Sequence, residues 1–253
     1  MKNIIKMILI GIETAVLFVV VGGLTSAITK TIYSDILIEN FKSKAVYDEE
    51  ASSDMLKVYV VPSNEERPTV EKIGKDYYPG NTGDIIITLQ SELTIPFIHE
   101  IVSFFAGGHA ALVLGDYEDL LDKTTSMDTI ESSGLNDDLN LADTYPKPLW
   151  QDYPFPIIGL RVRMTEEERT RVLTRGLALA GDPYNYSFLF DTNNKSYCSD
   201  LVGKAFDSVG VNLNKDGFTT SIYDLLISGE TYMTYYRYFD NNGVEYVYYL
   251  DSK

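Results

Sequence analysis

Cys198 is the only cysteine of the chain and stands where a helix is expected to begin. The segment 195–200 is polar, and from Leu201 to Val209 apolar residues recur at helical spacing. Ser196 is the predicted N-cap, which would put Cys198 in the first turn, where free backbone N–H groups and the helix dipole favour a thiolate. A lone cysteine is more often a small buried hydrophobe, but a core residue has no need of so polar a first turn. The pattern predicts a nucleophilic cysteine.

A nucleophilic thiol needs a base within hydrogen-bond reach, and the chain has two histidines, His99 and His109. His99 falls at the margin of the apolar stripe of an expected helix, so a surface or boundary role is predicted for it. His109 directly follows Gly107 and Gly108 at the head of an apolar run of strand length. This small-residue turn would leave the His109 ring facing a cleft, although an ordinary strand-edge histidine would have the same neighbours. His109 is the better candidate base.

A third polar group must orient the imidazole. Asp116 is on the same expected strand as His109, but seven residues away at about 3.3 Å per residue it is too distant, and its odd offset puts it on the opposite face. Glu131 belongs to a separate short run, 129–132, that is expected to form a neighbouring strand. If the two strands pair, the Glu131 carboxylate can accept the imidazole N–H. A solvent-exposed strand glutamate is the alternative interpretation.

The elements expected around these residues are separated strands and helices. A helix over 95–105 is predicted by apolar residues at helical spacing. Thr165 to Glu168 form a capping-box pattern that predicts a helix closed by Gly181. Because the strands and helices do not alternate as βαβ units, we expect an α+β fold, with a long surface loop over 135–156. The expected strands are 57–61, 83–89, 109–115, 129–132 and 157–163, followed by a hairpin over 232–238 and 245–250.

The composition is that of a folded, acidic protein. Of 253 residues, 45% are hydrophobic and 23% charged, which supports a sizeable core and excludes a disordered chain. Lys and Arg number 21 against 37 Asp and Glu, and the net charge of −16 would repel a phosphate backbone, so no nucleic-acid partner is expected. One cysteine and two histidines exclude a disulfide framework and leave little material for a metal site, so no cofactor is predicted.

The N-terminus carries an apolar run over 7–28 that follows the basic residues Lys2 and Lys6. A membrane span needs about 20 apolar residues, so the run predicts one transmembrane helix, a retained signal anchor over 1–30. The basic residues before it predict that the rest of the chain is exported. The alternative is a secretory signal peptide cleaved at the small residues 25–27.

The expected organisation therefore has three parts. The anchor over 1–30 is followed by a juxtamembrane spacer over 31–56, which contains the acidic run 48–54. The extracytoplasmic domain is expected over 57–253. The protein would lie in the cell membrane with a single span, or would be secreted if the signal were removed.

Several short motifs occur in an order that resembles one family. They are Gly83-Asp84-Ile85-Ile86, Gly108-His109-Ala110-Ala111-Leu112-Val113, Ile130-Glu131, the helix from Thr165, Gly181-Asp182-Pro183-Tyr184 and Tyr197-Cys198-Ser199-Asp200-Leu201-Val202. Over roughly 83–209 the chain resembles the circularly permuted papain-like hydrolases of the YiiX kind, relatives of NlpC-type wall peptidases. The order is informative, because histidine comes first, glutamate next and cysteine last, the reverse of ordinary papain-like chains.

This resemblance implies a fold and three roles. Cys198 would be the nucleophile, His109 the base and Glu131 the residue that orients it, on a small antiparallel sheet packed against the helix that carries the cysteine. Two positions depart from the family pattern: Asp200 stands where Glu is common, and Gly203 where a larger residue is usual. These departures concern local packing rather than the three roles. The resemblance does not define the substrate.

The expected function is a membrane-anchored extracytoplasmic cysteine hydrolase, a peptidase or amidase, that cleaves an amide bond, for example in cell-wall peptides. Its substrate would be a peptide, an amide or a lipid-linked compound, and its N-terminal helix would contact the membrane. Two alternatives stay open. One is a catalytically silent module that binds peptide or glycan through the Tyr-rich tail and the 135–156 loop. The other is an acyl-lipid hydrolase or transferase.

Overall fold

The computed structural model covers the N-terminal helix and most of the domain that follows it. The described residues are 2–63, 80–90, 107–115, 129–132, 142–145, 150, 153–186, 194–214 and 220–251, without the side chains of 2–20, 144 and 145. The helix expected over 95–105, which includes His99, and the position of Asp116 lie outside these residues.

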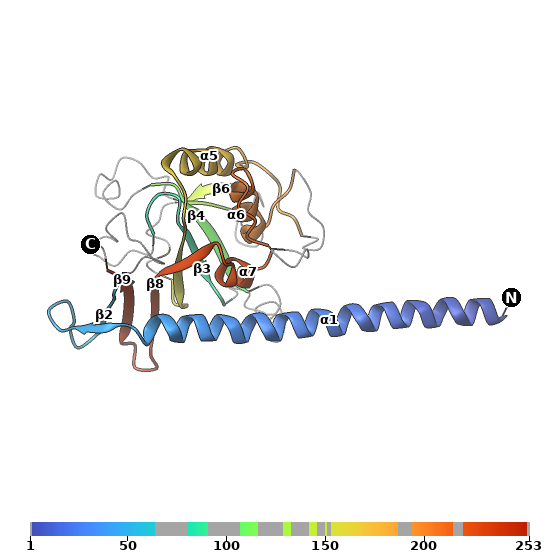
Figure 1. Cartoon of the computed structure of the whole chain (residues 1–253), viewed down its shortest axis with the longest axis horizontal. Helices are drawn as coiled ribbons and strands as arrows, with labels where there is room; N and C mark the ends of the chain where they lie inside the picture. Colours follow the sequence, from blue (N-terminus) through green and yellow to red (C-terminus); the bar gives the residue numbers. More distant parts are fainter. Residues whose placement is uncertain are drawn as a thin grey trace.

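Within the described residues, nine strands form one sheet (Figure 1). The order is β1-β2-β9-β8-β7-β3-β4-β5-β6, and neighbouring strands are antiparallel except for β2 and β9, which run parallel. The last strand thus lies beside an early one, so segments from both ends of the chain share the sheet. The strands are β1 (Val46–Asp48), β2 (Leu56–Val61), β3 (Ile85–Thr88), β4 (His109–Val113), β5 (Thr129–Ser132), β6 (Ala142–Tyr145), β7 (Ile157–Val162), β8 (Thr231–Phe239) and β9 (Glu245–Leu250).

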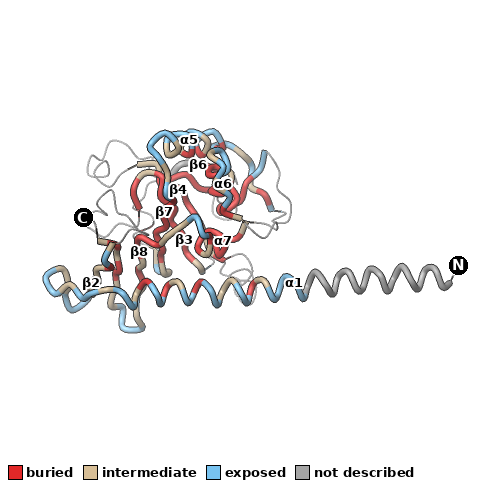
Figure 2. The backbone as a smooth tube through the Cα atoms, in the orientation of Figure 1, coloured by how far each residue is buried: buried red, intermediate tan, exposed pale blue. Residues whose placement is uncertain are grey.

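The middle strands of the sheet are buried on both faces. All residues of β3 and β7 are buried, as are the four residues of β4 that follow His109. Figure 2 shows these strands as the most buried part of the molecule. A strand covered on both faces has an almost continuous apolar sequence rather than an alternating one. This explains why short apolar runs were sufficient to predict β3, β4 and β7.

The second half of the chain contains one confirmed expectation and one correction. The C-terminal hairpin is confirmed: β8 pairs with β9 across a turn in which the Asp240 carboxylate accepts the N–H groups of Asn242 and Val244. The region 135–156 was expected to be loop throughout, but it contains β6, which pairs with β5 at the sheet edge. Its four residues have no hydrophobic alternation, and backbone pairing with β5 is what makes them a strand.

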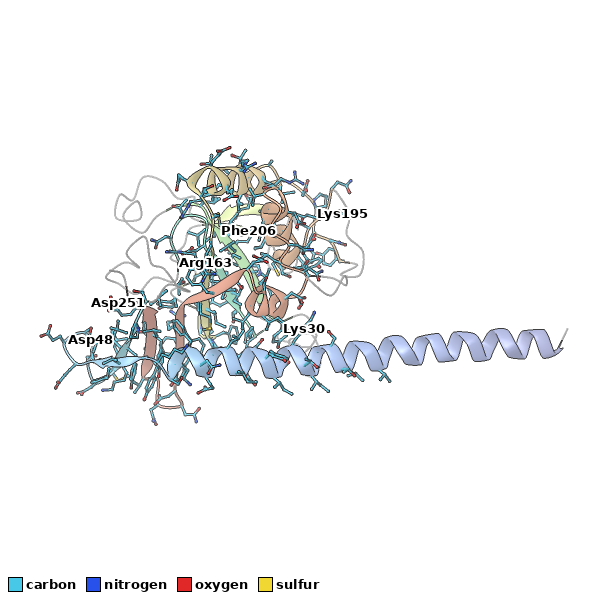
Figure 3. The ribbon with its side chains drawn as sticks, in the orientation of Figure 1. Lys30, Asp48, Arg163, Lys195, Phe206 and Asp251 are labelled. Carbon is cyan, nitrogen blue, oxygen red and sulfur yellow. The ribbon has the colours of Figure 1, made fainter. Side chains whose placement is uncertain are left out.

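Two helices pack beside β4. The helix α5 (Glu166–Leu177) begins with the predicted capping box, in which Thr165 and Glu168 bond to each other's backbone N–H. The helix α6 (Cys198–Asp207) contacts β4, β5 and α5, and its Phe206, labelled in Figure 3, is fully buried. These contacts fix the helix that carries Cys198 against the strand that carries His109.

The helix α1 (Lys2–Lys42) is continuous and extends well past the domain (Figure 1). Near its C-terminal end, Ile38 and Phe41 are buried against the rest of the protein. The helix α1 also contacts the short helix α7 (Ile222–Ile227). Residues 31–56, for which a spacer was expected, contain the end of α1, all of β1 and the first residue of β2.

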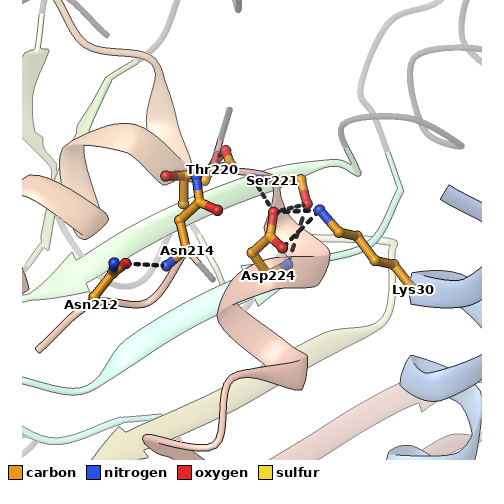
Figure 4. Close-up of polar contacts among 7 residues, drawn as sticks. Lys30, Asn212, Asn214, Thr220, Ser221 and Asp224 are labelled. Carbon is orange, nitrogen blue, oxygen red and sulfur yellow. Dashed lines mark hydrogen bonds and ion pairs between the residues drawn. The ribbon is translucent and has the colours of Figure 1, made fainter. Parts of the chain in front are cut away.

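Lys30 connects α1 to α7 through a buried carboxylate. Its Nζ lies 2.7 Å from Oδ1 and 2.9 Å from Oδ2 of Asp224, as Figure 4 shows. Asp224 also accepts the backbone N–H and the hydroxyl of Ser221 in a capping box. With Asp224 only 4% exposed, the contact pairs a charge that would otherwise be costly to bury.

The transmembrane helix expected before the domain is contradicted by the structure. In the part of the chain whose residues are described, no helix has a stretch both long and apolar enough to cross a bilayer. From Val21 onward α1 carries charged residues, including Lys30 and Asp35, and buries one side against the domain, so it is not apolar on all sides. Within the expected span over 7–28, the side chains of 7–20 lie outside the described part.

Candidate active site

Strand pairing places His109 and Glu131 on the same face of the sheet. β5 lies beside β4 with Leu112 opposite Ile130, which confirms the predicted pairing of these two strands. One residue further along this register, Glu131 lies opposite Ala111, and Ala111 shares its face with His109 because side chains alternate along a strand. The two polar side chains meet there: His109 Nε2 lies 2.6 Å from Oε2 of Glu131.

The Glu131 carboxylate is buried, with hydrogen bonds to both oxygens. Oε2 binds His109, while Oε1 accepts the Thr129 hydroxyl and the Trp150 indole N–H, each at 2.8 Å. Burial alone would raise the pKa of Glu131, but the charge of His109 and the hydrogen bonds from His109, Trp150 and Thr129 hold that pKa below its usual value. Glu131 is therefore ionised at neutral pH.

The pKa of the His109 ring responds to both Glu131 and Cys198. Burial alone would lower this pKa, yet hydrogen bonding to Cys198 and Glu131 and the negative charges of these two partners raise it well above its ordinary value. Because Glu131 binds Nε2, Nδ1 is the ring nitrogen left for the thiol. The site thus favours the imidazolium form of His109.

Cys198 is the first residue of α6 and is 8% exposed. The N-cap is Tyr197, which makes no side-chain cap hydrogen bond, so the prediction of Ser196 as N-cap is wrong. Ser196 instead forms a β-bridge with Tyr184, and its carbonyl accepts the Ser132 hydroxyl at 2.7 Å. The first N–H groups of a helix have no acceptor within it, so those at the start of α6 can donate to an oxyanion formed at Cys198.

The two positions that depart from the family pattern both lie on α6. The Asp200 carboxylate is paired with Lys204 Nζ at 2.6 Å, and Lys204 also donates to the carbonyl of Lys195 at 2.6 Å. This network ties the start of α6 to the segment before it. At Gly203, an added Cβ would make only ordinary contacts of 3.5 and 3.6 Å with Thr220. Close packing therefore does not require a glycine at this position.

Trp150 contributes to the site and was missed by the sequence analysis. It is the only tryptophan of the chain and is 2% exposed. Besides donating to Glu131, its ring stacks on His109 with centroids 5.6 Å apart and planes 9° from parallel. It lies in the region 135–156, which the sequence analysis treated as surface loop. A large aromatic residue in a polar segment is itself a signal of burial, because Trp usually has most of its surface covered.

Tyr184 was part of a motif but had no predicted role. Burial and then the negative charge of Cys198 are the largest causes that raise the pKa of the Tyr184 phenol above its usual value. The phenol therefore stays protonated at neutral pH. Tyr184 lies near the start of α6 because it pairs with Ser196, two residues before Cys198, in an isolated β-bridge.

Metal ligands do not gather in the part of the chain that the structure describes. No group of three or more His, Cys, Asp or Glu residues there could hold a metal ion. His99 and Asp116, the two residues not assigned to the site, lie outside the described residues.

A family model of the permuted papain-like amidases YaeF and YiiX, the C92 family, matches residues 80–224. The match covers more than half of the chain and includes His109, Glu131 and Cys198. The chain belongs to the C92 family. The family predicted from the sequence motifs is thereby confirmed, as is the permuted papain-like α+β fold. Membership also supports a hydrolase of the amidase kind.

One solved structure resembles this C92 protein. The crystal structure of the metalloprotein YiiX from Escherichia coli O157:H7 has a TM-score of 0.47 and 14% sequence identity, over 62% of this chain and 97% of that chain. Comparison with curated proteins finds no match. Membership of the C92 family therefore rests on the family model.

Proposed function

We propose that this C92 protein is a cysteine amidase in which Cys198 is the nucleophile, His109 the base and Glu131 the residue that orients the imidazole. The main support is the 2.6 Å contact between His109 and Glu131, together with the effect of Cys198 on the pKa of the same ring. Covalent catalysis requires a nucleophile, a base and an orienting group in contact. The raised pKa of His109 and the lowered pKa of Glu131 both favour the charged pair that this chemistry uses.

The reaction would proceed in two halves. In the first, the Cys198 thiolate attacks the amide carbonyl carbon, and the C–N bond breaks as the His109 imidazolium gives its proton to the leaving amine. The product is a thioester on the sulfur. In the second half, neutral His109 takes a proton from water, whose oxygen attacks the thioester, and the acid product leaves as the thiolate is restored.

Two further groups would stabilise the reaction's charges. The N–H groups at the start of α6 would hold the oxyanion that develops in each half. Glu131 would stay ionised and stabilise the imidazolium without taking its proton. The hydrogen bonds that Glu131 accepts from Thr129 and Trp150 support this role, because they favour its charged form.

The proposed substrate is a peptide amide, with cell-wall peptides as the first to test. Family membership supports an amide as the bond that is cleaved, and the acyl and amine portions have to be found by experiment. The full chain should be incubated with peptidoglycan fragments and, separately, with lipid amides, and the products read by mass spectrometry. The proposal is supported if a peptidoglycan fragment is cleaved into an acid and an amine whose masses together exceed that of the fragment by one water.

The control for this experiment is Cys198→Ala, which should remove all turnover. If only the lipid amides are cleaved, the substrate is an acyl-lipid amide and not a peptide. If neither substrate is cleaved and Cys198 does not react with iodoacetamide near neutral pH, the protein is a silent binding module and the enzyme proposal is wrong.

A further inference from the structure

We propose that Trp150 is a positioning residue that fixes the His109 ring and the Glu131 carboxylate relative to each other. The inference rests on the proposed function, since it assigns Trp150 a task in the same reaction. It concerns a residue that touches the base and its orienting partner but not the sulfur or the substrate carbonyl in the proposed mechanism.

One rigid side chain makes both contacts. The indole Nε1 donates to Oε1 of Glu131 at 2.8 Å, and the ring lies parallel to the His109 ring within 9° at a centroid separation of 5.6 Å. Because Nε1–H occupies Oε1, Oε2 is the oxygen turned to His109. A planar indole cannot change one contact without changing the other, so it sets the carboxylate rotation and the imidazole plane together.

Trp150 is itself held by buried neighbours. Its ring stacks on Tyr153 at 5.2 Å and 17°. From β8, Arg237 Nη2 donates to the carbonyl of Tyr153 at 2.6 Å and to that of Trp150 at 3.4 Å. Arg237 is 4% exposed and also lies 3.8 Å from Oε1 of Glu245 through its Nε. Trp150 and Tyr153 are thus both tied to β8, as a positioning residue requires.

Both contacts favour the charged state of the pair. The negative face of an indole attracts a cation, so it stabilises the imidazolium more than the neutral imidazole. The indole N–H is a charge-assisted donor to the carboxylate. Loss of either contact should leave the imidazolium less stable, so Cys198 should react more slowly at low pH. This effect is specific to the site, whereas a packing defect would not depend on pH in this way.

The test measures the rate of Cys198 alkylation by iodoacetamide against pH, which needs no substrate. Trp150→Phe keeps an aromatic face but removes the N–H, and Trp150→Leu removes both. We expect alkylation at about pH 6 to slow about threefold to tenfold in Trp150→Phe and more in Trp150→Leu, with little change at about pH 9, where the thiol ionises without help. Tyr235→Leu, at a buried aromatic of β8, is the packing control and should keep the wild-type pH profile.

The outcomes separate this inference from the proposed function. If His109→Ala leaves the alkylation profile unchanged, the proposed base is wrong and the inference falls with it. If His109→Ala shifts the profile while both Trp150 variants keep the wild-type profile, the proposed function stands and the positioning role is refuted. If Trp150→Leu does not fold, Trp150→Phe alone decides. A slowing that is equal at both pH values, or that Tyr235→Leu reproduces, would show a merely structural role.

Discussion

The ionic contact between His109 and Glu131 dominates the site at the scale of single residues. Each partner is buried, and each shifts the pKa of the other in the direction of its charged form. Thr129 and Trp150 share the remaining oxygen of the carboxylate. The pair therefore has consequences both for catalysis and for the dependence of stability on pH.

For catalysis, Glu131 should matter less than the residues whose atoms react. Glu131→Gln keeps the shape but loses the charge, and Glu131→Ala loses both. Either change should lower kcat/KM by a smaller factor than Cys198→Ala or His109→Ala, because an orienting group only stabilises the imidazolium and its geometry. Steady-state kinetics would measure this with whichever substrate the incubation experiment identifies. The control is Asp116→Asn, which should have nearly the wild-type kcat/KM. If Asp116→Asn lost most of its activity while Glu131→Ala kept it, the assignment of Glu131 would be wrong.

The pH dependence of stability follows from the same pair. The pKa of His109 is raised on folding, so its stabilisation is fully present below about pH 6.5 and is lost as the pH rises through the folded value. The pKa of Glu131 is lowered, so its stabilisation is present above about pH 4.5 and is lost as the pH falls through the folded value. Both contributions are present together between these two limits.

Glu131→Gln removes the charge that links the two contributions. Denaturant unfolding of both proteins at several pH values should show the largest difference in free energy of unfolding between about pH 4.5 and 6.5, shrinking on either side. Placing an amide in the buried site would also lower the free energy of unfolding, but by the same amount at every pH. A difference that stays flat from about pH 3 to 9 would mean that the pair is not charged in the folded protein.

At the scale of elements, the start of α7 contacts both segments that carry the reacting groups. Ile222 lies against Gly107, two residues before His109, and an added Cβ at Gly107 would lie 2.6 Å from the Ile222 Cβ. The hydroxyl of Ser199, next to Cys198, donates to the Thr220 carbonyl at 2.8 Å. The turn before β4 and the first turn of α6 are thus held by the same short segment.

Gly107→Ala should therefore be far more damaging than a matched glycine substitution. Gly107 and Gly210 both have φ of +79°, but a Cβ at Gly210 would meet nothing within 4 Å. Gly210→Ala carries only the backbone strain, about 1 to 2 kcal/mol, whereas Gly107→Ala adds a clash and should cost a few kcal/mol more. Denaturant unfolding measures both. Equal losses in the free energy of unfolding would show that α7 shifts easily to make room for the added Cβ.

At the scale of the whole molecule, the same α7 is where α1 is held. Lys30 pairs with the buried Asp224 of α7, and the side chains of this ion pair are only 13% and 5% exposed. Ile38 and Phe41 extend the buried face of α1 further along the helix. The C-terminal part of α1 is thus packed on the element that supports the site.

Lys30→Met should measurably loosen this attachment. Asp224 would stay buried without its cation but would keep its bonds to Ser221, so we expect a loss of about 1 to 3 kcal/mol in the free energy of unfolding. Lys42→Met breaks the pair with Glu39, whose side chain is 69% exposed, and should cost at most about 1 kcal/mol. Equal effects of the two changes, measured by denaturant unfolding, would show that the Lys30 contact does not hold α1.

Local patterns were enough to predict much of the domain. Apolar runs predicted the central strands, a capping box predicted the start of α5, and turn residues predicted the C-terminal hairpin. Each of these signals comes from interactions within a few residues, which a sequence displays directly. The order of histidine, glutamate and cysteine motifs similarly predicted the family. The strand over 129–132 was predicted as a possible neighbour of the His109 strand, and the two do pair.

Contacts between distant segments required the folded structure. Trp150 stacks on His109, which is distant in the sequence, and Tyr184 lies near the start of α6 because it pairs with Ser196. The apolar run over 7–28 predicted a membrane span, but the large apolar side chains of α1 that are buried on the protein, Ile38 and Phe41, come after this run. An apolar pattern does not say which residues of a segment will be buried. Which surface covers it depends on how the whole chain folds.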